Sequence, residues 1–160
     1  MSVTPRLSIR RATRDDLTAI VRIERASFGR DAWERPWFAD YLSRENCLFL
    51  IAESGKAIVG YALAVHNPAR AELDSIAVIP SHRGSGIAVA LMNHLMALLR
   101  RRGVLSMSLM VRLDNAAAIA LYRKLGFRRE RRINGYYDDG APAWRMSRSE
   151  PPDLCPADRS

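Results

Sequence analysis

The stretch IAVIPSHRGSGIA, residues 76–88, joins an apolar strand to the start of a long helix. Pro80 ends the strand, and Gly84 and Gly86 precede the helix, where glycine lets a ligand approach the backbone closely. The first N–H groups of a helix have no acceptor within it, and the helix dipole favours negative charge there. The stretch therefore predicts an anion-binding turn suited to a pyrophosphate. An ordinary strand-to-helix turn, which uses glycine only for its geometry, is the alternative.

Regular elements are predicted on both sides of this turn from apolar spacing and turn residues. The predicted strands are 7–11, 47–52, 57–65, 72–78, 105–111, 127–137 and 143–147. The predicted helices are 13–28, 37–43, 87–102 and 115–126. The strand–helix–strand crossover in the middle of this order implies locally parallel strands. The expected fold class is α/β (α+β), with a mixed central sheet and helices on both faces.

The length of 160 residues fits a single domain. We expect this domain to span residues 1–148 and the proline-rich segment 149–160 to be a disordered tail, because it has few apolar residues. No apolar run reaches the roughly 18 residues of a membrane helix, and the N-terminus has no apolar stretch typical of a secretory signal. These features predict a cytoplasmic protein.

The charge balance is strongly basic, with 25 Lys and Arg against 17 Asp and Glu and a net charge of +8. Most of this charge is arginine, clustered at 100–102 and 128–132. Arginine suits contact with phosphate groups. The simpler interpretation is that these arginines lie on solvent-exposed faces and bind no ligand. No zinc-finger spacing or single-stranded nucleic-acid platform is present, so direct nucleic-acid binding is not expected.

Cysteine and histidine do not form a recognisable site in the sequence. Cys47 and Cys155 are too few for a disulfide framework, and His82 and His94 lack partners at metal-ligand spacing. We therefore expect no metal. Neither cysteine is expected to be a nucleophile, because Cys47 falls in a buried strand and Cys155 in the predicted tail.

Two motifs in this order resemble one enzyme superfamily. The pattern Arg83-x-x-Gly86-x-Ala88 after an apolar strand resembles the coenzyme A pyrophosphate loop of the GNAT superfamily of acyl-CoA-dependent N-acyltransferases. The segment NAAAIALYRKLGF, residues 115–127, resembles the second signature of the same superfamily. The resemblance covers roughly residues 7–147, and it implies a single GNAT-like domain.

Shorter phrases resemble one group within that superfamily, the RimI-type protein N-terminal acetyltransferases, which include ribosomal-protein alanine acetyltransferases. These phrases are ASF at 26–28, VR at 111–112 and YYDDG at 136–140. The resemblance implies acetyl-CoA as co-substrate and a protein or peptide acceptor, with a ribosomal protein as one candidate.

The resemblance also assigns the coenzyme contacts. The backbone of residues 76–78 would bind the pantetheine arm and the acetyl carbonyl, and residues 83–88 would bind the pyrophosphate. Asn115 would contact the coenzyme, and Tyr122 would lie near its sulfur. The implied coenzyme-binding residues are Ile76, Ala77, Val78, Arg83, Gly84, Ser85, Gly86, Ile87, Ala88, Asn115 and Tyr122.

Tyr122 has two interpretations. Within the second signature it would protonate the departing thiolate. By its helical spacing from Ala118 and Leu125 alone, it would be a core residue with a bonded hydroxyl.

Aromatic residues near two predicted loops are candidates for acceptor binding. They are Phe28, Trp33, Tyr136 and Tyr137. Trp33 would either shape the acceptor loop or anchor it to the core. The two tyrosines would wall the groove or form an aromatic pair on an edge strand.

The general base is the open question, because RimI-type enzymes carry a glutamate at the position of Met110, two residues before Arg112. Methionine cannot accept a proton. Glu72 is the first candidate, since histone-acetyltransferase-type relatives use a glutamate at that strand position. Asp74 or a loop acid, Asp31 or Glu34, is the second, and the absence of any side-chain base is the third.

The alternation of side chains along a strand predicts which residues of the strand 72–78 point to the same face. Residues two apart point to the same side, so Glu72, Asp74, Ile76 and Val78 are expected to share one face.

These observations predict direct acetyl transfer from acetyl-CoA to a primary amine, foremost the N-terminal α-amine of a protein. A lysine or small-molecule amine acetyltransferase is the enzymatic alternative, made serious by Met110. An acyl-CoA-binding sensor or a domain that docks on RNA or the ribosome is the non-catalytic alternative.

Overall fold

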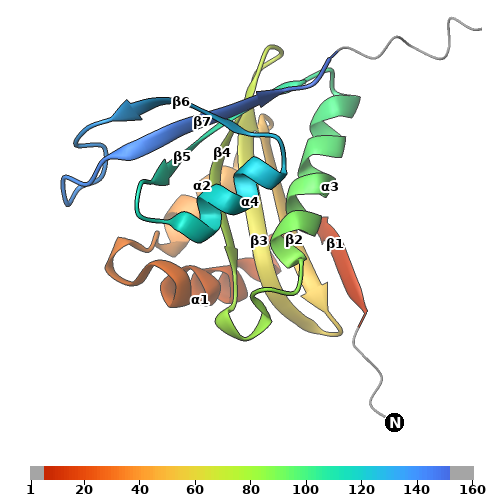
Figure 1. Ribbon diagram of the computed structural model, residues 1–160. Coiled ribbons are helices and arrows are strands. Elements are labelled where there is room, and N and C mark those ends of the chain that lie inside the picture. Colours follow the sequence, from red (N-terminus) through yellow and green to blue (C-terminus); the bar gives the residue numbers. More distant parts are fainter. Residues whose placement is uncertain (1–5, 152–160) are drawn as a thin grey trace, which may run out of the picture.

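The computed structural model describes residues 6–151, which form a seven-stranded sheet flanked by four α-helices (Figure 1). The strands are β1 (Leu7–Arg11), β2 (Cys47–Ser54), β3 (Ala57–His66), β4 (Ala71–Val78), β5 (Ser106–Arg112), β6 (Arg128–Ile133) and β7 (Ala143–Ser149). The helices are α1 (Leu17–Phe28), α2 (Arg35–Ser43), α3 (Ile87–Arg101) and α4 (Ala116–Lys124). The predicted order of strands and helices is confirmed.

The sheet is mixed and has the order β1-β2-β3-β4-β5-β7-β6. Only β4 and β5 pair in parallel, because the α3 crossover connects them. Helices α1 and α2 pack on one face around Ile20, Phe38 and Tyr61, and α3 and α4 pack on the other around Leu91 and Leu95. The predicted fold class, with helices on both faces, is confirmed.

The last two strands end at other residues than expected. β6 ends at Ile133, not at residue 137, because the chain turns at Gly135 with a φ of +62°. β7 continues to Ser149, and the Glu150 N–H donates to the Leu105 carbonyl, so the regular structure passes the expected boundary at 148. The rest of the predicted tail, Cys155 included, lies outside the described residues.

β4 and β5 pair along only part of their length. The paired residues run from Ala71 with Met107 to Leu73 with Leu109, and beyond them the strands separate. We call the gap between residues 74–78 of β4 and the end of β5 the strand opening. Backbone groups that face it have no neighbouring strand to bond.

A β-bulge at Asp74 changes which residues of β4 share a face. Leu73 pairs with Ala64 of β3 and Ser75 with the adjacent Leu63, so Asp74 is the extra residue. Strict alternation is therefore interrupted. Ile76 and Val78 pack with α3 and α4, while Asp74 points to the α1–α2 face, where it contacts α2.

The expectation that Glu72, Asp74, Ile76 and Val78 share one face is thus wrong. A single inserted residue moves every side chain beyond it to the other side of the strand. The two carboxylates lie on one face of the sheet, and the two apolar side chains lie on the other.

Gly60 in β3 brings α3 close to this region. A Cβ atom at Gly60 would lie 3.0 Å from the Ala77 carbonyl oxygen and 3.3 Å from Leu91 of α3. The missing side chain therefore lets α3 pack directly over the end of β4. The N-terminus of α3 is held beside the strand opening as a result.

Candidate active site

The strand opening exposes backbone groups of β4 in an alternating pattern. The Ile79 N–H donates to Val59 of β3, and successive residues of an antiparallel strand alternate sides. The N–H groups of Ile76 and Val78 therefore point into the opening, and those of Ala77 point to β3. Of the three residues expected to bind through their backbone, the register leaves Ile76 and Val78 available.

The predicted anion-binding turn lies directly after β4. Gly84 and Gly86 have φ of +79° and +84°, which favour glycine. A Cβ would meet nothing within 4 Å at either position, so glycine serves the backbone conformation and leaves the site open to a ligand. Within the described chain, no N–H from Gly84 to Ala88 donates to a backbone carbonyl. Five consecutive donors around the N-terminus of α3 thus suit an anion.

Arg83 begins this turn but points back toward β4. Its Nε donates to the Val78 carbonyl at 3.2 Å, and its guanidinium also donates to the Ser27 hydroxyl at 3.3 Å. The arginine therefore links the turn to α1 and to the strand opening.

Asn115 is the N-cap of α4. Its side-chain oxygen accepts a hydrogen bond from the Ala118 N–H at 3.1 Å. This bond fixes the start of α4 and leaves the amide NH₂ of Asn115 as a donor. A coenzyme contact through that group is compatible with the capping role.

The Tyr122 ring lies in the core, but its hydroxyl is not hydrogen-bonded as the core interpretation expected. The ring is 7% exposed and packs edge-on against Phe127, with centroids 5.8 Å apart. Its hydroxyl has no hydrogen-bond partner among the described residues. Burial raises the pKa of Tyr122 to about 12, with Tyr137 a smaller contribution, so the phenol carries its proton at neutral pH. The buried ring of Tyr122 thus carries a protonated hydroxyl that is free to donate a hydrogen bond.

The two β4 carboxylates lie on the opposite face of the sheet from Tyr122. The Asp74 carboxylate accepts a 2.7 Å hydrogen bond from the Tyr41 hydroxyl, and burial raises its pKa. Glu72 is more exposed, and its pKa is raised by partial burial of the carboxyl group and by the charge of Asp74. Arg145 opposes that rise. Raised carboxyl pKa values beside an opening are typical of groups that exchange protons.

Met110 lies on the same face as these carboxylates, since it alternates with the core residues Leu109 and Val111. It offers no proton acceptor there. Beyond it, Arg112 contacts Asp139 at 2.9 Å and Asp31 at 3.5 Å.

Arg112 therefore joins two loops that flank the opening, the α1–α2 loop and the β6–β7 loop. Its guanidinium also lies 4.1 Å from the centre of the Tyr137 ring. Asp31, one of the candidate bases, forms an ion pair with Arg112. Glu34 is exposed at the start of α2.

The predicted acceptor-binding aromatics fall into two groups. Tyr136 and Phe28 are 48% and 43% exposed, and Tyr136 lies in the electrostatic field of both β4 carboxylates. Trp33 stacks on Tyr41 at 5.6 Å, so it anchors the acceptor loop to the core. Tyr136 and Tyr137 pack edge-on in the β6–β7 loop, so the edge-strand alternative is wrong.

A buried network was missed in the sequence. Glu24 of α1 is 2% exposed and accepts hydrogen bonds from the Trp33 N–H, at 3.1 Å, and from the Tyr61 hydroxyl. Tyr61 is also hydrogen-bonded to Ser75, at 2.8 Å. The network connects the acceptor loop to β4. Its only sequence signal was a glutamate beside Ile23 in the apolar stripe of α1.

Other predicted residues play no visible part in the site. Burial raises the pKa of the Cys47 thiol to about 12, so it is a poor nucleophile at neutral pH. The His82 ring is hydrogen-bonded to the neighbouring Ser81 hydroxyl, and His94 is exposed on α3. Over residues 6–151, no group of three potential metal ligands is present.

Comparison with known proteins shows one family. Residues 15–127 match the acetyltransferase (GNAT) family. The N-alpha-acetyltransferase RimI of Mycobacterium tuberculosis is 35% identical over 151 residues, 91% of this chain and 94% of its own. The [ribosomal protein bS18]-alanine N-acetyltransferase of Escherichia coli K12 is 35% identical over 122 residues, 76% of this chain and 81% of its own.

Solved structures have the same fold. The crystal structure of the ribosomal-protein-S18-alanine N-acetyltransferase from Escherichia coli superposes with a TM-score of 0.83 at 31% identity, over 94% of this chain and 99% of that one. A protein from Salmonella typhimurium, solved with its cofactor acetyl-CoA, has a TM-score of 0.77 at 24% identity, over 93% and 99%. The family match and these relatives together show that the chain belongs to the GNAT acetyltransferase family.

Proposed function

We propose that this protein transfers an acetyl group directly from acetyl-CoA to the N-terminal α-amine of a polypeptide. The observation that carries the proposal is the strand opening, with a protonated Tyr122 on the α3–α4 face and two carboxylates on the α1–α2 face. An acid and a base on opposite sides of one opening suit two substrates that enter from opposite faces. The N-alpha-acetyltransferases among the relatives support the α-amine as acceptor.

The coenzyme would occupy the α3–α4 side. Its pyrophosphate suits the free N–H groups from Gly84 to Ala88, and its pantetheine arm suits the open backbone of Ile76 and Val78. Acetyl-CoA supplies an activated acetyl group and leaves as the free thiol. The Ile76 N–H, which is nearer to the β4 carboxylates than the Val78 N–H, is a donor for negative charge that develops on the carbonyl oxygen.

The acceptor would arrive on the α1–α2 side, between the loops that Arg112 joins. An α-amino group has a pKa of about 8 and must lose a proton before its lone pair attacks. The carbon–nitrogen bond then forms and the carbon–sulfur bond breaks. A carboxylate of β4 takes the amine proton, directly or through water, and Tyr122 gives its proton to the departing sulfur.

Glu72 is the preferred base of the two carboxylates. An oxygen of the Asp74 carboxylate already accepts a hydrogen bond from the Tyr41 hydroxyl. Within the described chain, the Glu72 carboxylate accepts no hydrogen bond. Glu72 is also more exposed, so water can connect it to the amine. Asp74 then acts through its charge, which raises the pKa of Glu72.

Mass spectrometry of acetylated peptides tests the proposal. Purified protein is incubated with acetyl-CoA and a peptide that has a free N-terminus and an internal lysine. Acetylation of the first residue is the expected result. Acetylation of the lysine alone would favour the alternative acceptor, and coenzyme binding by calorimetry without any acetylated product would favour the non-catalytic sensor.

The acceptor protein and the cellular location stay proposals. A ribosomal protein is the first acceptor to test, because a related enzyme acts on one. No described helix is long and apolar enough to cross a bilayer.

A further inference from the structure

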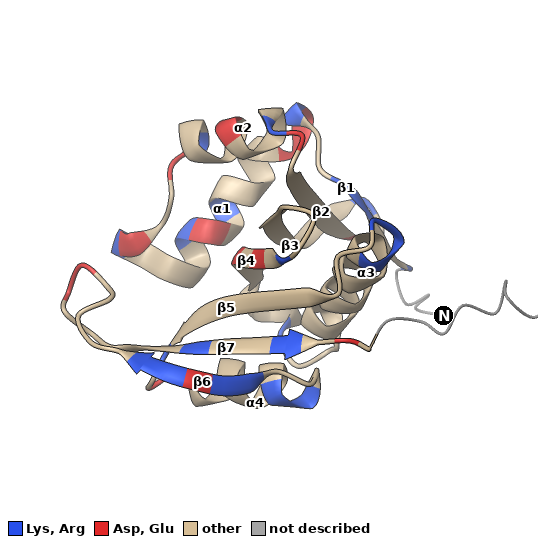
Figure 2. Cartoon of the chain, turned by 90° about the horizontal axis from the view of Figure 1, so that it is seen from above, with Lys and Arg blue, Asp and Glu red and all other residues tan. Residues whose placement is uncertain are grey.

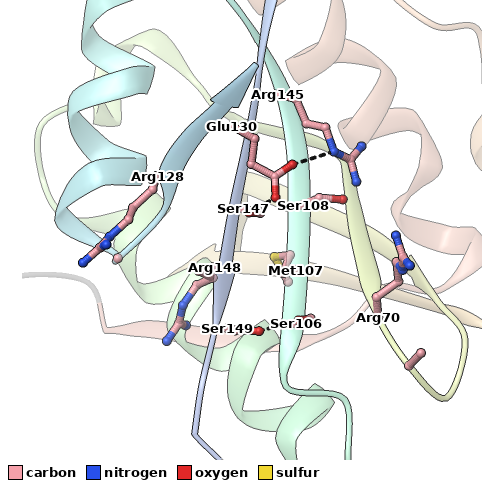
Figure 3. Close-up of a pocket in the computed structure, with 12 residues that line it drawn as sticks. Arg70, Ser106, Met107, Ser108, Arg128, Glu130, Arg145, Ser147, Arg148 and Ser149 are labelled. Atoms are coloured by element: carbon pink, nitrogen blue, oxygen red, sulfur yellow. Dashed lines mark hydrogen bonds and ion pairs between the residues drawn. The ribbon is translucent and has the colours of Figure 1, made fainter. Parts of the chain in front are cut away.

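A groove of about 680 Å³ crosses the sheet beside the candidate active site (Figure 3). Its floor is formed by β5 and β7, and its sides by the β3–β4 hairpin and by β6. Neither α1 nor α2 contributes to its lining, since both pack over the β1–β4 half of the sheet. We call it the arginine groove, after Arg70, Arg128, Arg145 and Arg148, which line it.

The arginine groove has an excess of positive charge. Glu130 is its only lining carboxylate, and it is engaged by Arg145 at 3.0 Å and by the Ser147 hydroxyl. Arg70 and Arg128 are exposed, and neither forms an ion pair within residues 6–151. Figure 2 shows β6 as an almost continuous basic edge. Two unpaired guanidinium groups on opposite sides of a groove match a ligand that carries carboxylates.

Serine side chains line the floor between these arginines. Ser108 of β5 is only 6% exposed, yet its hydroxyl has no hydrogen-bond partner in the described chain. Ser106 and Ser149 bond to each other at the far end. A nearly buried hydroxyl that lines a groove without a partner is available to a ligand.

The groove is continuous with the acceptor side of the active site. Ser108 on its floor pairs in register with Glu72 on β4. Arg145 pairs with Met110 across β5 and β7, and its charge acts on Glu72. A chain that presents its amine to Glu72 therefore enters the groove at once.

We propose that the arginine groove binds acidic side chains of the acceptor polypeptide a few residues after its N-terminus. This proposal rests on the proposed function, because it takes the acceptor to be a polypeptide. From β4 across β5 and β7 to β6 is three strand spacings, about 14 Å, which an extended chain covers in about four residues. The preferred acidic residues are accordingly expected at positions four to six. The N-terminal ammonium faces Glu72 and Asp74. Arg70 lies on the near side of the groove beside β4, and the carboxylates at positions four to six face Arg128 on β6.

A peptide fits this groove better than a nucleic acid. None of its lining side chains is aromatic, so no base can stack there. Glu130 lies among the arginines and would repel a continuous phosphate backbone. The serine hydroxyls and the separated arginines suit a polypeptide with acidic residues at intervals.

Two peptides test the proposal on the full chain. They are identical except for Glu or Gln at positions four to six, and N-terminal acetylation of both is measured as kcat/KM at low and high salt. The wild-type protein is expected to prefer the Glu peptide, mainly through KM, and salt should weaken the preference. Exposed ion pairs change binding by roughly 1.5- to 5-fold each. The Arg70→Ser/Arg128→Ser double variant should therefore lower the preference roughly 2- to 25-fold, with the Gln peptide unaffected.

The control is the Arg11→Ser/Arg14→Ser double variant, which removes the same charge near the opposite edge of the sheet. It should retain the preference of the wild-type protein. Equal kcat/KM for both peptides in the wild-type protein, or an equal loss of preference in the control, would overturn the groove proposal and leave the proposed function standing. Inhibition by an RNA oligonucleotide that depends on Arg70 and Arg128, without peptide discrimination, would also overturn it in favour of nucleic acid. Failure to acetylate either peptide at its N-terminus would instead refute the proposed function.

Discussion

At the scale of single residues, the pH dependence of activity distinguishes the roles of Glu72 and Asp74. Glu72 must be deprotonated to accept a proton, so activity falls as the pH drops through its pKa. The charge of Asp74 raises that pKa. Asp74→Asn should thus move the acid limb of kcat/KM to lower pH while retaining the maximal rate, and the asparagine oxygen can still accept the Tyr41 hydrogen bond.

Glu72→Gln should instead lower kcat by about 10²- to 10⁴-fold, the usual contribution of a general base. Stopped-flow or coupled thiol assays from pH 5 to about 9 would measure both variants. If Asp74→Asn shows the large loss and Glu72→Gln does not, the assignment of the base reverses.

Tyr122→Phe tests the acid at the same scale. The substitution keeps the ring against Phe127 and removes a hydroxyl that has no partner among the described residues. The melting temperature should therefore hardly change, while kcat falls by about 10²-fold because a positioned acid is lost. An unchanged kcat in a stably folded variant would leave Tyr122 as a core residue only.

At the scale of elements, the start of α3 determines coenzyme binding. Gly86→Glu places a carboxylate beside five free N–H groups, so it should abolish coenzyme binding in calorimetry. It also strains a φ of +84°, at a cost of about 1–2 kcal/mol.

Gly103→Glu is a matched control for that strain. Gly103 follows the other end of α3, has a φ of +78° and would also meet nothing within 4 Å. It should lose similar stability and bind coenzyme normally. Normal affinity in Gly86→Glu would show that the turn does not hold the pyrophosphate.

At the scale of the whole molecule, Arg112 connects three separate parts of the chain. It extends from β5 and pairs with Asp31 and Asp139 in the two loops that flank the acceptor side. Arg112→Gln should raise the KM for a peptide roughly 2- to 10-fold, because each exposed pair contributes about 0.2–1 kcal/mol. The KM for acetyl-CoA should change little.

Arg10→Gln serves as the comparison, since Arg10 also pairs with two carboxylates, Asp16 at 2.8 Å and Glu53 at 2.6 Å, but lies in β1 at the opposite edge of the sheet. It should leave both KM values unaltered. Equal KM values for Arg112→Gln and the wild-type protein would mean that the loops hold their positions without this arginine.

The sequence by itself determined the features that depend on neighbouring residues. The order of strands and helices and the glycine turn before α3 follow from spacing over a few residues, and both are present in the structure. Tyr122 could be singled out for the same reason, because it belongs to one continuous motif.

Only the tertiary structure decided which groups meet around the opening. The bulge at Asp74 depends on how β4 pairs with Leu63 and Ala64, ten residues or so away, and it reverses the faces expected from alternation. The contact of Asp31 with Arg112 joins residues far apart in the chain. Such pairings are set by packing between elements, which leaves no local pattern in the sequence.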